Sequence, residues 1–182
     1  MSRIPTPATI AAAPAAARPI LEAVEKQIGL VPNLFRVMAN SPPALEGAVA
    51  LDQALARGRL GVKTRERIAL AVSELNGCTY CLSAHSYVGK HLAKLDDAEL
   101  LANREGGSTD PKAAAAVRFA AKIVTTRGHV TDADVRALKA AGYDDEEVIE
   151  IVAHVAMTTL TNYVNEVAQT AIDFPVVARR AQ

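Results

Sequence analysis

The sequence predicts an all-α protein, and three observations support this fold class. Alanine, leucine, valine, glutamate and lysine dominate the 182 residues, and most of these residue types favour helices. Aromatic residues are few, with four tyrosines, three phenylalanines and no tryptophan. No stretch alternates apolar and polar residues for long enough to form a strand, whereas apolar residues recur three and four positions apart, as on one face of a helix.

The length and charge of the chain limit its organisation and its partners. A chain of this length with half of its residues apolar can bury a substantial core, which predicts one main domain. Basic and acidic residues number 20 each, so the formal charge is zero, and neither nucleic acid nor a membrane surface is a predicted partner. No apolar run is long enough to span a bilayer, and two cysteines are too few for a secreted disulfide framework. We therefore expect a soluble, cytoplasmic protein.

Residues 1–18 are predicted to form a mobile or loosely packed arm, and residues 19–182 to form the helical domain. Three prolines interrupt the alanine-rich arm before a helix can propagate. Pro19 then opens a first helix that Gly29 ends, because proline suits the first helical turn and glycine suits the residue after the last turn. A connection with a short helical turn leads to the next helix, at residues 44–55.

A helical hairpin at about residues 61–106 is predicted to form the core of the domain. Its first helix is expected to start at Thr64, a good N-cap residue, and to stop at Gly77. Its second helix is expected to start near Cys78 and to continue through Leu92. The core face of the first helix is a stripe of apolar residues at helical spacing, namely Ile68, Ala71, Val72 and Leu75.

The last third of the chain is also predicted to be helical. A final helix follows the acidic run at residues 144–147, and these carboxylates are better explained as favouring a helix N-terminus than as a metal site. An apolar stripe extends this helix to about residue 172, ahead of Pro175. Three helices precede it: a short one capped by Asp96 or Asp97, and longer ones at residues 111–126 and 131–140.

Both cysteines and one histidine lie within the segment CTYCLSAH, at residues 78–85. A helix that begins at Cys78 places Cys81 one turn later and His85 a further turn later, so the three side chains share one face. Cysteines three apart at a helix start have Cα atoms about 5 to 6 Å apart, within the range that a disulfide needs. The helix N-terminus also stabilises a thiolate, so this segment predicts a redox-active pair.

Two arguments differ on which sulfur attacks a substrate. His85 lies one turn from Cys81 and can take its proton, which favours Cys81. Cys78 lies nearer to the helix end, where the dipole is strongest, which favours Cys78. We give the histidine argument more weight, which predicts Cys81 as the attacking sulfur.

Glu66 has two interpretations. It lies on a second, partly apolar face of its helix, and if that face packs on the cysteine helix, Glu66 becomes a partly buried carboxylate that exchanges protons near neutrality. From spacing alone, an exposed first-turn glutamate that favours the helix dipole is the simpler interpretation.

A zinc site is the main chemical alternative to a redox pair. Its ligands would be Cys78, Cys81, His85 and His91. The geometry is weak, because a structural zinc site usually draws its two ligand pairs from separate elements. We therefore predict neither a metal nor a cofactor.

The pattern E-x11-C-x2-C-x3-H, from Glu66 through Cys78 and Cys81 to His85, resembles the alkyl hydroperoxidase D-like (AhpD-like) branch of the carboxymuconolactone decarboxylase superfamily. The segments LVPNLFRVMANSPPALEG and NYVNEVAQTAIDFP are also similar to segments of these proteins. The resemblance implies an AhpD-like helical fold in which Cys81 attacks a peroxide and Cys78 resolves the product. It implies a proton relay through Glu66 and His85. Well-studied members have a histidine where this chain has Tyr80, which is a poorer proton carrier near neutrality.

The resemblance also implies an activity and partners. The activity is that of a thiol-dependent peroxidase, which reduces alkyl hydroperoxides and is reduced in turn by an external dithiol on a lipoylated or thioredoxin-like protein. The assembly is a homo-oligomer, either a trimer or a hexamer, and the long apolar C-terminal helix would suit its interface. Two other functions stay open: a decarboxylase-like lactone enzyme, against which the cysteine pair argues, and an oligomeric thiol redox sensor.

Overall fold

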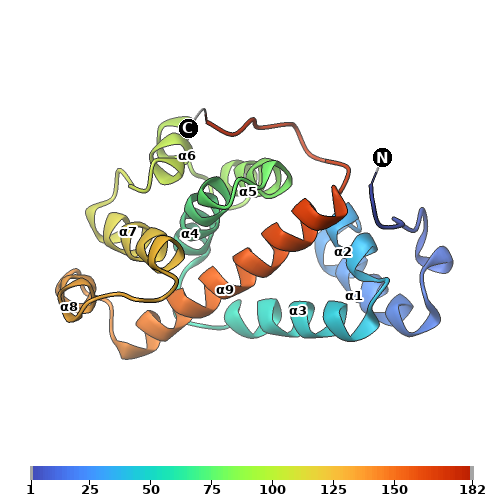
Figure 1. Ribbon diagram of the computed structural model, residues 1–182, viewed down its shortest axis with the longest axis horizontal. Coiled ribbons are helices and arrows are strands. Elements are labelled where there is room, and N and C mark those ends of the chain that lie inside the picture. Colours follow the sequence, from blue (N-terminus) through green and yellow to red (C-terminus); the bar gives the residue numbers. More distant parts are fainter. Residues whose placement is uncertain (1, 181–182) are drawn as a thin grey trace.

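The computed structural model describes residues 2–180, which form helices and connecting segments (Figure 1). No strand occurs in this range, so the predicted all-α class is confirmed. Two short 3-10 turns, Ile10–Ala12 and Ala15–Ala17, come first. The α-helices that follow are α1 Arg18–Ile28, α2 Asn33–Met38, α3 Pro42–Leu55, α4 Val62–Leu75, α5 Thr79–His91, α6 Asp97–Arg104, α7 Pro111–Thr126, α8 Asp132–Ala140 and α9 Asp145–Ala168.

Helix α4 lies at the centre of the domain and contacts α5, α6, α7 and α9 (Figure 1). Its residues 67–73 are all buried, as expected for a helix that is covered on every side. Ile68 and Val72 of α4 belong to the largest core cluster, which also contains residues of α7, α8 and α9. Because α4 is fixed on several sides, it provides a rigid support for Glu66.

A second core cluster lies between α1, α2, α3 and the segment ahead of α1. Leu21 of α1 and Leu45 of α3 are buried in it. Ala13 and Ala17 join them, although the sequence predicts a mobile or loosely packed arm at residues 1–18. Both 3-10 turns contact α1, and the second one, Ala15–Ala17, also contacts α3. The prolines of the arm thus prevent a long helix without keeping its alanines out of the core.

Several helix ends differ by a few residues from their expected positions, among them the start of α3 at Pro42, the start of α4 and the end of α9. Helix α4 begins at Val62, two residues before Thr64, because Gly61 adopts the extended conformation of an N-cap. Helix α9 ends at Ala168 rather than near residue 172, because Gln169 adopts the left-handed conformation with φ 49°. Figure 1 shows that the chain then turns back across α5 towards α6. We call this returning segment, residues 170–180, the C-terminal strap.

The acidic run ahead of α9 caps that helix, as predicted. The Asp144 side chain accepts a hydrogen bond from the backbone N–H of Glu147, and the Glu147 side chain accepts one from the N–H of Asp144. This reciprocal pair satisfies two backbone donors that the first turn of a helix leaves free. Among residues 2–180, no helix has both the length and the apolar character that a membrane span requires.

Candidate active site

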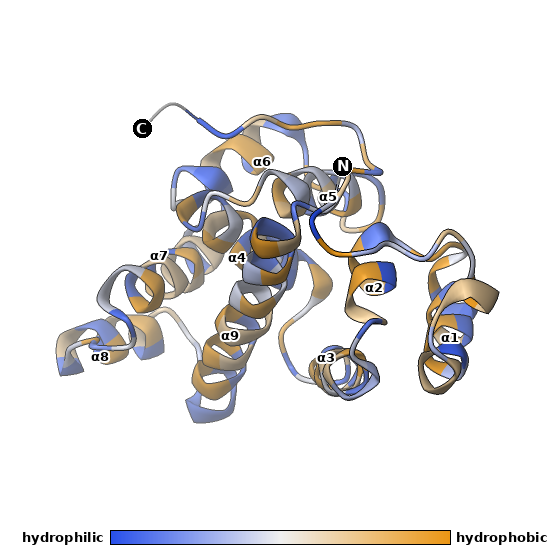
Figure 2. Cartoon of the chain, turned by 45° about the vertical axis from the view of Figure 1, so that its right-hand side comes forward, coloured by the Kyte–Doolittle hydropathy of each residue, from blue (hydrophilic) through white to orange (hydrophobic). Residues whose placement is uncertain are grey.

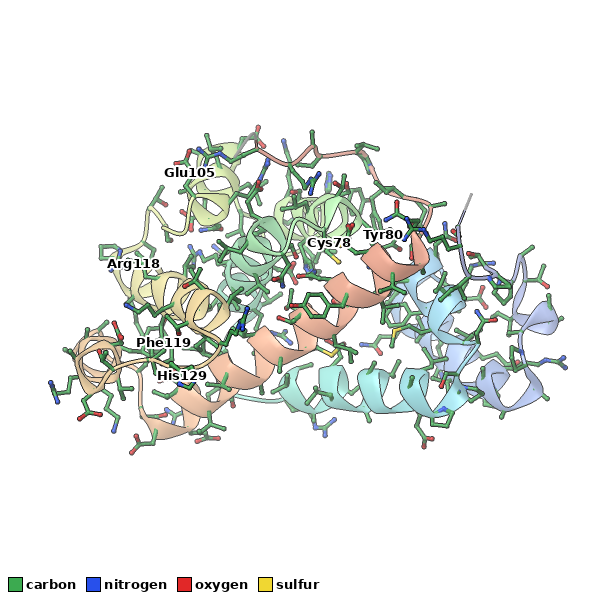
Figure 3. All side chains as sticks on the ribbon, in the orientation of Figure 1. Cys78, Tyr80, Glu105, Arg118, Phe119 and His129 are labelled. Atoms are coloured by element: carbon green, nitrogen blue, oxygen red, sulfur yellow. The ribbon has the colours of Figure 1, made fainter. Side chains whose placement is uncertain are left out.

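The turn between α4 and α5 brings the two cysteines to the start of α5. Gly77 adopts φ 70°, a conformation that favours glycine, and the N–H of Cys78 then donates to the carbonyl of Ser73. Cys78 is the N-cap of α5, and its Sγ accepts a hydrogen bond of 3.3 Å from the backbone N–H of Cys81. In Figure 3 Cys78 and Tyr80 lie on α5 beside the C-terminal end of α9.

Both cysteines are free thiols and are buried, with 0% of Cys78 and 2% of Cys81 exposed. Tyr80 is buried with them, and the partly buried Ile172 and Phe174 of the C-terminal strap pack against the same cluster. The strap therefore helps to shield the sulfurs from solvent.

The structure brings Glu66 and His85 together, as the partly buried interpretation of Glu66 predicts. The Nδ1 of His85 lies 2.8 Å from Oε2 of Glu66, and only 28% and 13% of the two side chains are exposed. Glu66 comes from α4 and His85 from α5, so the pair joins the two arms of the predicted hairpin. The exposed alternative for Glu66 is wrong, because the second face of α4 does pack on α5.

The two sulfurs differ in acidity. The side chain of Cys78 hydrogen-bonds to Cys81, and this bond is the largest influence on both pKa values. For Cys81, that bond, the charge of His85 and side-chain amides of α9 outweigh burial and lower the pKa to about 6. For Cys78, the same bond, burial and the neighbouring charge of Cys81 raise the pKa. At neutral pH the pair is thus a Cys81 thiolate that receives a hydrogen bond from a Cys78 thiol.

His85 and Tyr80 are suited to different tasks. Burial opposes the protonation of His85, but the charge of Glu66 and its hydrogen bond, with help from Cys81, outweigh burial and raise the pKa of His85 above its ordinary value. His85 can therefore hold a proton near neutral pH. Burial raises the pKa of Tyr80, whose hydroxyl accepts a 3.1 Å hydrogen bond from the N–H of Leu34. Tyr80 is a neutral packing residue, and it does not replace a titrating histidine.

The sequence analysis missed two asparagines of α9 that face the cysteine helix. The Nδ2 of Asn165 donates to the Sγ of Cys81 at 3.2 Å. Asn162 is fully buried, donates to Oγ of Ser73 and accepts from Asn76. A signal was present, because the segment NYVNEVA places two amides three residues apart, on one face of the helix.

The other histidines lie outside this arrangement. His91 is exposed and stacks on Tyr87 with ring centroids 4.5 Å apart, and His129 is exposed in a loop. His154 of α9 is buried, and its Nε2 has no hydrogen-bond partner among the described residues. Within residues 2–180, no three His, Cys, Asp or Glu side chains are gathered as ligands of one metal ion.

A cavity of about 300 Å³ lies between α5, α6 and the C-terminal strap. Its lining includes Ser83, Tyr87 and Lys90 of α5 but neither Cys81 nor His85. Helical spacing places these lining residues on the face of α5 opposite the sulfurs. The cavity therefore does not open onto Cys81, whereas the side chain of His85, which lies on the sulfur side of α5, is 28% exposed.

A family model described as the carboxymuconolactone decarboxylase family matches residues 42–122. This range contains α3 to α6 and most of α7, and it includes all four predicted site residues. A comparison with curated proteins gives no match.

Solved structures show the same fold. One is a chain from Ralstonia eutropha JMP134 that is described as an alkylhydroperoxidase AhpD core and an uncharacterized peroxidase-related protein. It is 30% identical to this chain and superposes with a TM-score of 0.83. The match covers 94% of this chain and 92% of that one. An uncharacterized peroxidase-related protein from Silicibacter sp. TM1040 is 25% identical, with 94% of both chains covered and a TM-score of 0.78. A third structure is a cysteine variant of the debrominase Bmp8 in complex with 2,3,4-tribromopyrrole, which is 23% identical with a TM-score of 0.79. The match covers 95% of this chain and 94% of that one, and at this identity it supports the fold alone.

Proposed function

Since the chain belongs to the carboxymuconolactone decarboxylase family, in its AhpD-like branch, we propose that it is a thiol-dependent peroxidase that reduces alkyl hydroperoxides. The observation that carries the proposal is the unequal cysteine pair. Cys81 has a pKa of about 6, and Cys78 is a neutral thiol in hydrogen-bond contact with it. A thiolate is the nucleophilic form of cysteine, and a neighbouring thiol is what a peroxidase needs to trap the oxidised sulfur.

In the proposed reaction the Cys81 thiolate attacks the terminal oxygen of the hydroperoxide, and the O–O bond breaks. The sulfur takes the terminal OH and becomes a sulfenic acid, while the alkoxide leaves and takes a proton from His85. The Cys78 thiol then condenses with the sulfenic acid, which forms the S–S bond and releases water. Each turnover thus converts one hydroperoxide into an alcohol and water and oxidises two thiols to a disulfide.

Glu66 is proposed to keep His85 charged between turnovers. Its carboxylate lies 2.8 Å from His85 and is the main influence that raises the pKa of the imidazole against burial. After the alkoxide has taken its proton, His85 regains one from solvent, to which its ring is partly exposed.

An external dithiol is the proposed reductant. It attacks the disulfide by thiol exchange and ends as a disulfide itself, so the two cysteines return to thiols. Because both sulfurs are buried, a dithiol on a slender arm, such as a lipoyl group, reaches them more easily than one fixed on a flat protein surface. A thioredoxin-like donor would need the C-terminal strap to move.

The proposal is tested by following hydroperoxide loss with lipoamide and with a thioredoxin-like donor. We expect Cys81→Ser to be inactive and His85→Ala to be slowed at least a hundredfold, since general acid catalysis contributes about 10² to 10⁴. Cys78→Ser should give a single turnover when small thiols are absent. His91→Ala, an exposed imidazole on the same helix, is the matched control and should behave as wild type. Equal activity in all variants would rule out the peroxidase.

The exposed face of α9 supports the proposed homo-oligomer. Ile149, Val152, Leu160, Tyr163 and Val167 are 42% to 68% exposed, and they recur at helical spacing along α9. In Figure 2 much of this helix is coloured as apolar, with hydrophilic residues at both of its ends. A continuous apolar stripe on one long helix is the kind of surface that another copy covers, and we propose a trimer or a hexamer.

A further inference from the structure

Asn165 of α9 hydrogen-bonds to Cys81 from outside the cysteine helix. Its Nδ2 donates to Sγ at 3.2 Å, within the range of a hydrogen bond to sulfur. The residue is 2% exposed, so water does not compete for this contact. An N–H donor favours a thiolate over a thiol, because only the charged sulfur is a strong acceptor.

The other atom of the same amide is unusual. The Oδ1 of Asn165 is buried, and among residues 2–180 it has no hydrogen-bond partner. Buried carbonyl oxygens are almost always paired in folded proteins, so an unpaired one beside a reactive atom points to a ligand. Oδ1 and Nδ2 of one carboxamide are separated by only about 2.2 Å, so the unpaired oxygen lies close to the sulfur as well.

The neighbouring residues explain why the amide stays in place. The backbone carbonyl of Asn165 accepts from the N–H groups of Gln169 and Thr170, which fixes the last turn of α9. One turn earlier, Asn162 is held by Asn76 and Ser73 of the α4 end. The side chain of Asn165 is thus presented to Cys81 from a rigid helix end, and its role does not depend on a mobile loop.

We propose that Asn165 is a further catalytic residue, whose Nδ2 holds the Cys81 sulfur as a thiolate and whose Oδ1 accepts the O–H of the incoming hydroperoxide. The first role depends only on the reduced protein, whereas the second rests on the peroxidase function proposed above. Together the two contacts direct the terminal oxygen of the substrate towards the attacking sulfur. The substrate class that fits is a hydroperoxide with a free O–H, and a dialkyl peroxide lacks that donor.

The first role is tested by alkylating the reduced protein with iodoacetamide between pH 4 and pH 10 and mapping the label on Cys81 by mass spectrometry. Asn165→Leu is a substitution of similar shape, and in this variant we expect the pH midpoint of Cys81 alkylation to rise by at least one unit. A rise of one unit corresponds to a tenfold lower ionisation constant of the thiol. In Asn165→Asp the new carboxylate should raise it further. Thr161→Val, which removes a buried hydroxyl of α9 that bonds to Thr158, should leave it unchanged. An unchanged midpoint in folded Asn165→Leu, checked by circular dichroism, would overturn this role.

The second role is tested at pH 9.5, where Cys81 is expected to be ionised in wild type and in Asn165→Leu. We expect cumene hydroperoxide to oxidise Cys81 at least tenfold more slowly in Asn165→Leu, although the thiolate is formed. Equal rates there would overturn the contact with substrate. If wild type does not react with hydroperoxides at any pH between 4.5 and 9.5, the proposed function fails, while a shifted midpoint would still establish Asn165 as a thiolate ligand.

Discussion

At the scale of single residues, the site depends on a charge placed where burial opposes it. Cys81 is almost fully buried, and burial alone would keep its sulfur protonated. The hydrogen bond from Cys78, the charge of His85 and the amide of Asn165 outweigh burial. The same bond makes Cys78 the weaker acid, so one contact assigns different roles to two chemically identical side chains. This electrostatic difference supports Cys81 over Cys78 as the attacking sulfur.

The pH dependence of turnover should show two limbs. The rising limb should centre near pH 6, because Cys81 must lose its proton before it attacks. The falling limb should centre at a pH above 6.5, which is about the ordinary pKa of a histidine. The reason is that the pKa of His85 is raised, so its proton stays available to higher pH. Steady-state rates between pH 4.5 and pH 9.5 measure both limbs.

Glu66→Gln is the informative variant for this profile. Loss of the carboxylate charge should move the falling limb to lower pH, because Glu66 supports the charged imidazole. The rising limb should move much less. A falling limb that stays in place in Glu66→Gln would mean that another group limits the rate at high pH.

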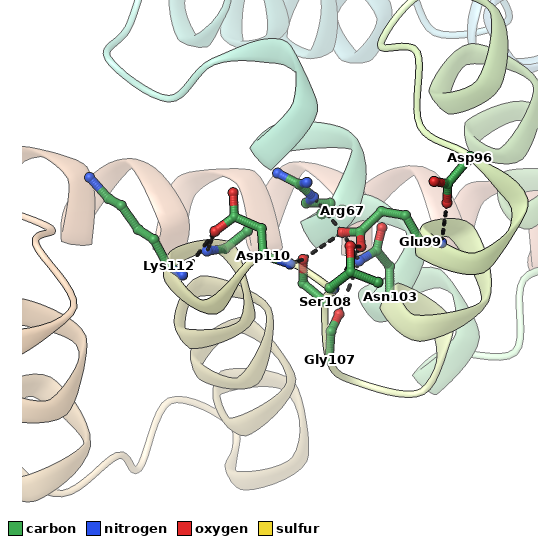
Figure 4. Close-up of polar contacts among 10 residues, drawn as sticks. Arg67, Asp96, Glu99, Asn103, Gly107, Ser108, Asp110 and Lys112 are labelled. Atoms are coloured by element: carbon green, nitrogen blue, oxygen red, sulfur yellow. Dashed lines mark hydrogen bonds and ion pairs between the residues drawn. The ribbon is translucent and has the colours of Figure 1, made fainter.

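At the scale of secondary-structure elements, a buried carboxylate fixes the junction between α4, α6 and the loop that leads to α7 (Figure 4). Glu99 of α6 is 3% exposed and lies 2.6 Å from Nε of Arg67 on α4. It also accepts hydrogen bonds from Asn103, Ser108 and Thr109. Arg67 adjoins Glu66 in α4, so this junction orients the helix that carries the proton relay.

Glu99→Gln should lower the free energy of unfolding by about 3 kcal/mol, because it leaves Arg67 buried without a charged partner. Urea unfolding at pH 7 measures this loss. Asp97→Asn, which removes an exposed ion pair to Lys90, is the control and should cost at most about 1 kcal/mol.

The stability that Glu99 provides should also depend on pH. Burial opposes its charge, but its hydrogen bonds outweigh burial and lower its pKa from 4.5 to about 2. A group with a lowered folded pKa stabilises the protein above its unfolded pKa and loses that effect as the pH falls through the folded value. The difference in unfolding free energy between wild type and Glu99→Gln should therefore shrink between about pH 4.5 and pH 2. A difference that is constant over this range would contradict the assigned role.

The C-terminal strap is the element that covers the sulfurs. Phe174 packs edge-on against Tyr80 with ring centroids 5.9 Å apart, and the N–H of Val177 donates to Oγ of Ser83. Phe174→Ala should therefore expose the cysteine pair and raise the rate of Cys81 alkylation several-fold at a pH where the thiolate is fully formed. Val176→Ala, at a strap residue that is 68% exposed, is the matched control. Equal rates in wild type and Phe174→Ala would show that the strap does not limit access.

At the scale of the whole molecule, the exposed apolar stripe of α9 predicts the assembly. Replacing Tyr163 and Val167 with lysine should reduce the mass measured by light scattering towards that of one chain, because both side chains lie exposed on the stripe. A paired substitution on α8, Arg136→Ala with Lys139→Ala, is the control and should leave the mass unchanged. A wild-type protein that is already a monomer at micromolar concentration would contradict the proposed oligomer.

Much of the fold could be predicted from sequence because its signals are local. Gly29 and the capping residues at 96, 131 and 144 mark helix ends through the chemistry of single positions. The end of α9 could not be predicted in this way, because Gln169 is not a residue type that usually stops a helix. Its left-handed conformation lets the strap return over α5, which is a tertiary effect.

In the candidate site, too, some residues could be predicted from local spacing and others depend on tertiary packing. Cys78, Cys81 and His85 lie within two turns of one helix, so spacing alone placed them on one face. Glu66 required knowledge of which face of α4 packs on α5, and the pattern shared with the family supplied it where periodicity did not. Asn165 lies 84 residues beyond Cys81, and only the packing of α9 against α5 brings its amide to the sulfur.

The most direct test of this account is the reactivity of each cysteine in the reduced wild-type protein as a function of pH. The rate of alkylation, resolved by peptide mass spectrometry, should rise for Cys81 with a midpoint near pH 6. Cys78 should stay unreactive until far more alkaline conditions, because its pKa is raised. Two cysteines that both titrate above pH 8, or a Cys78 that ionises before Cys81, would contradict the account.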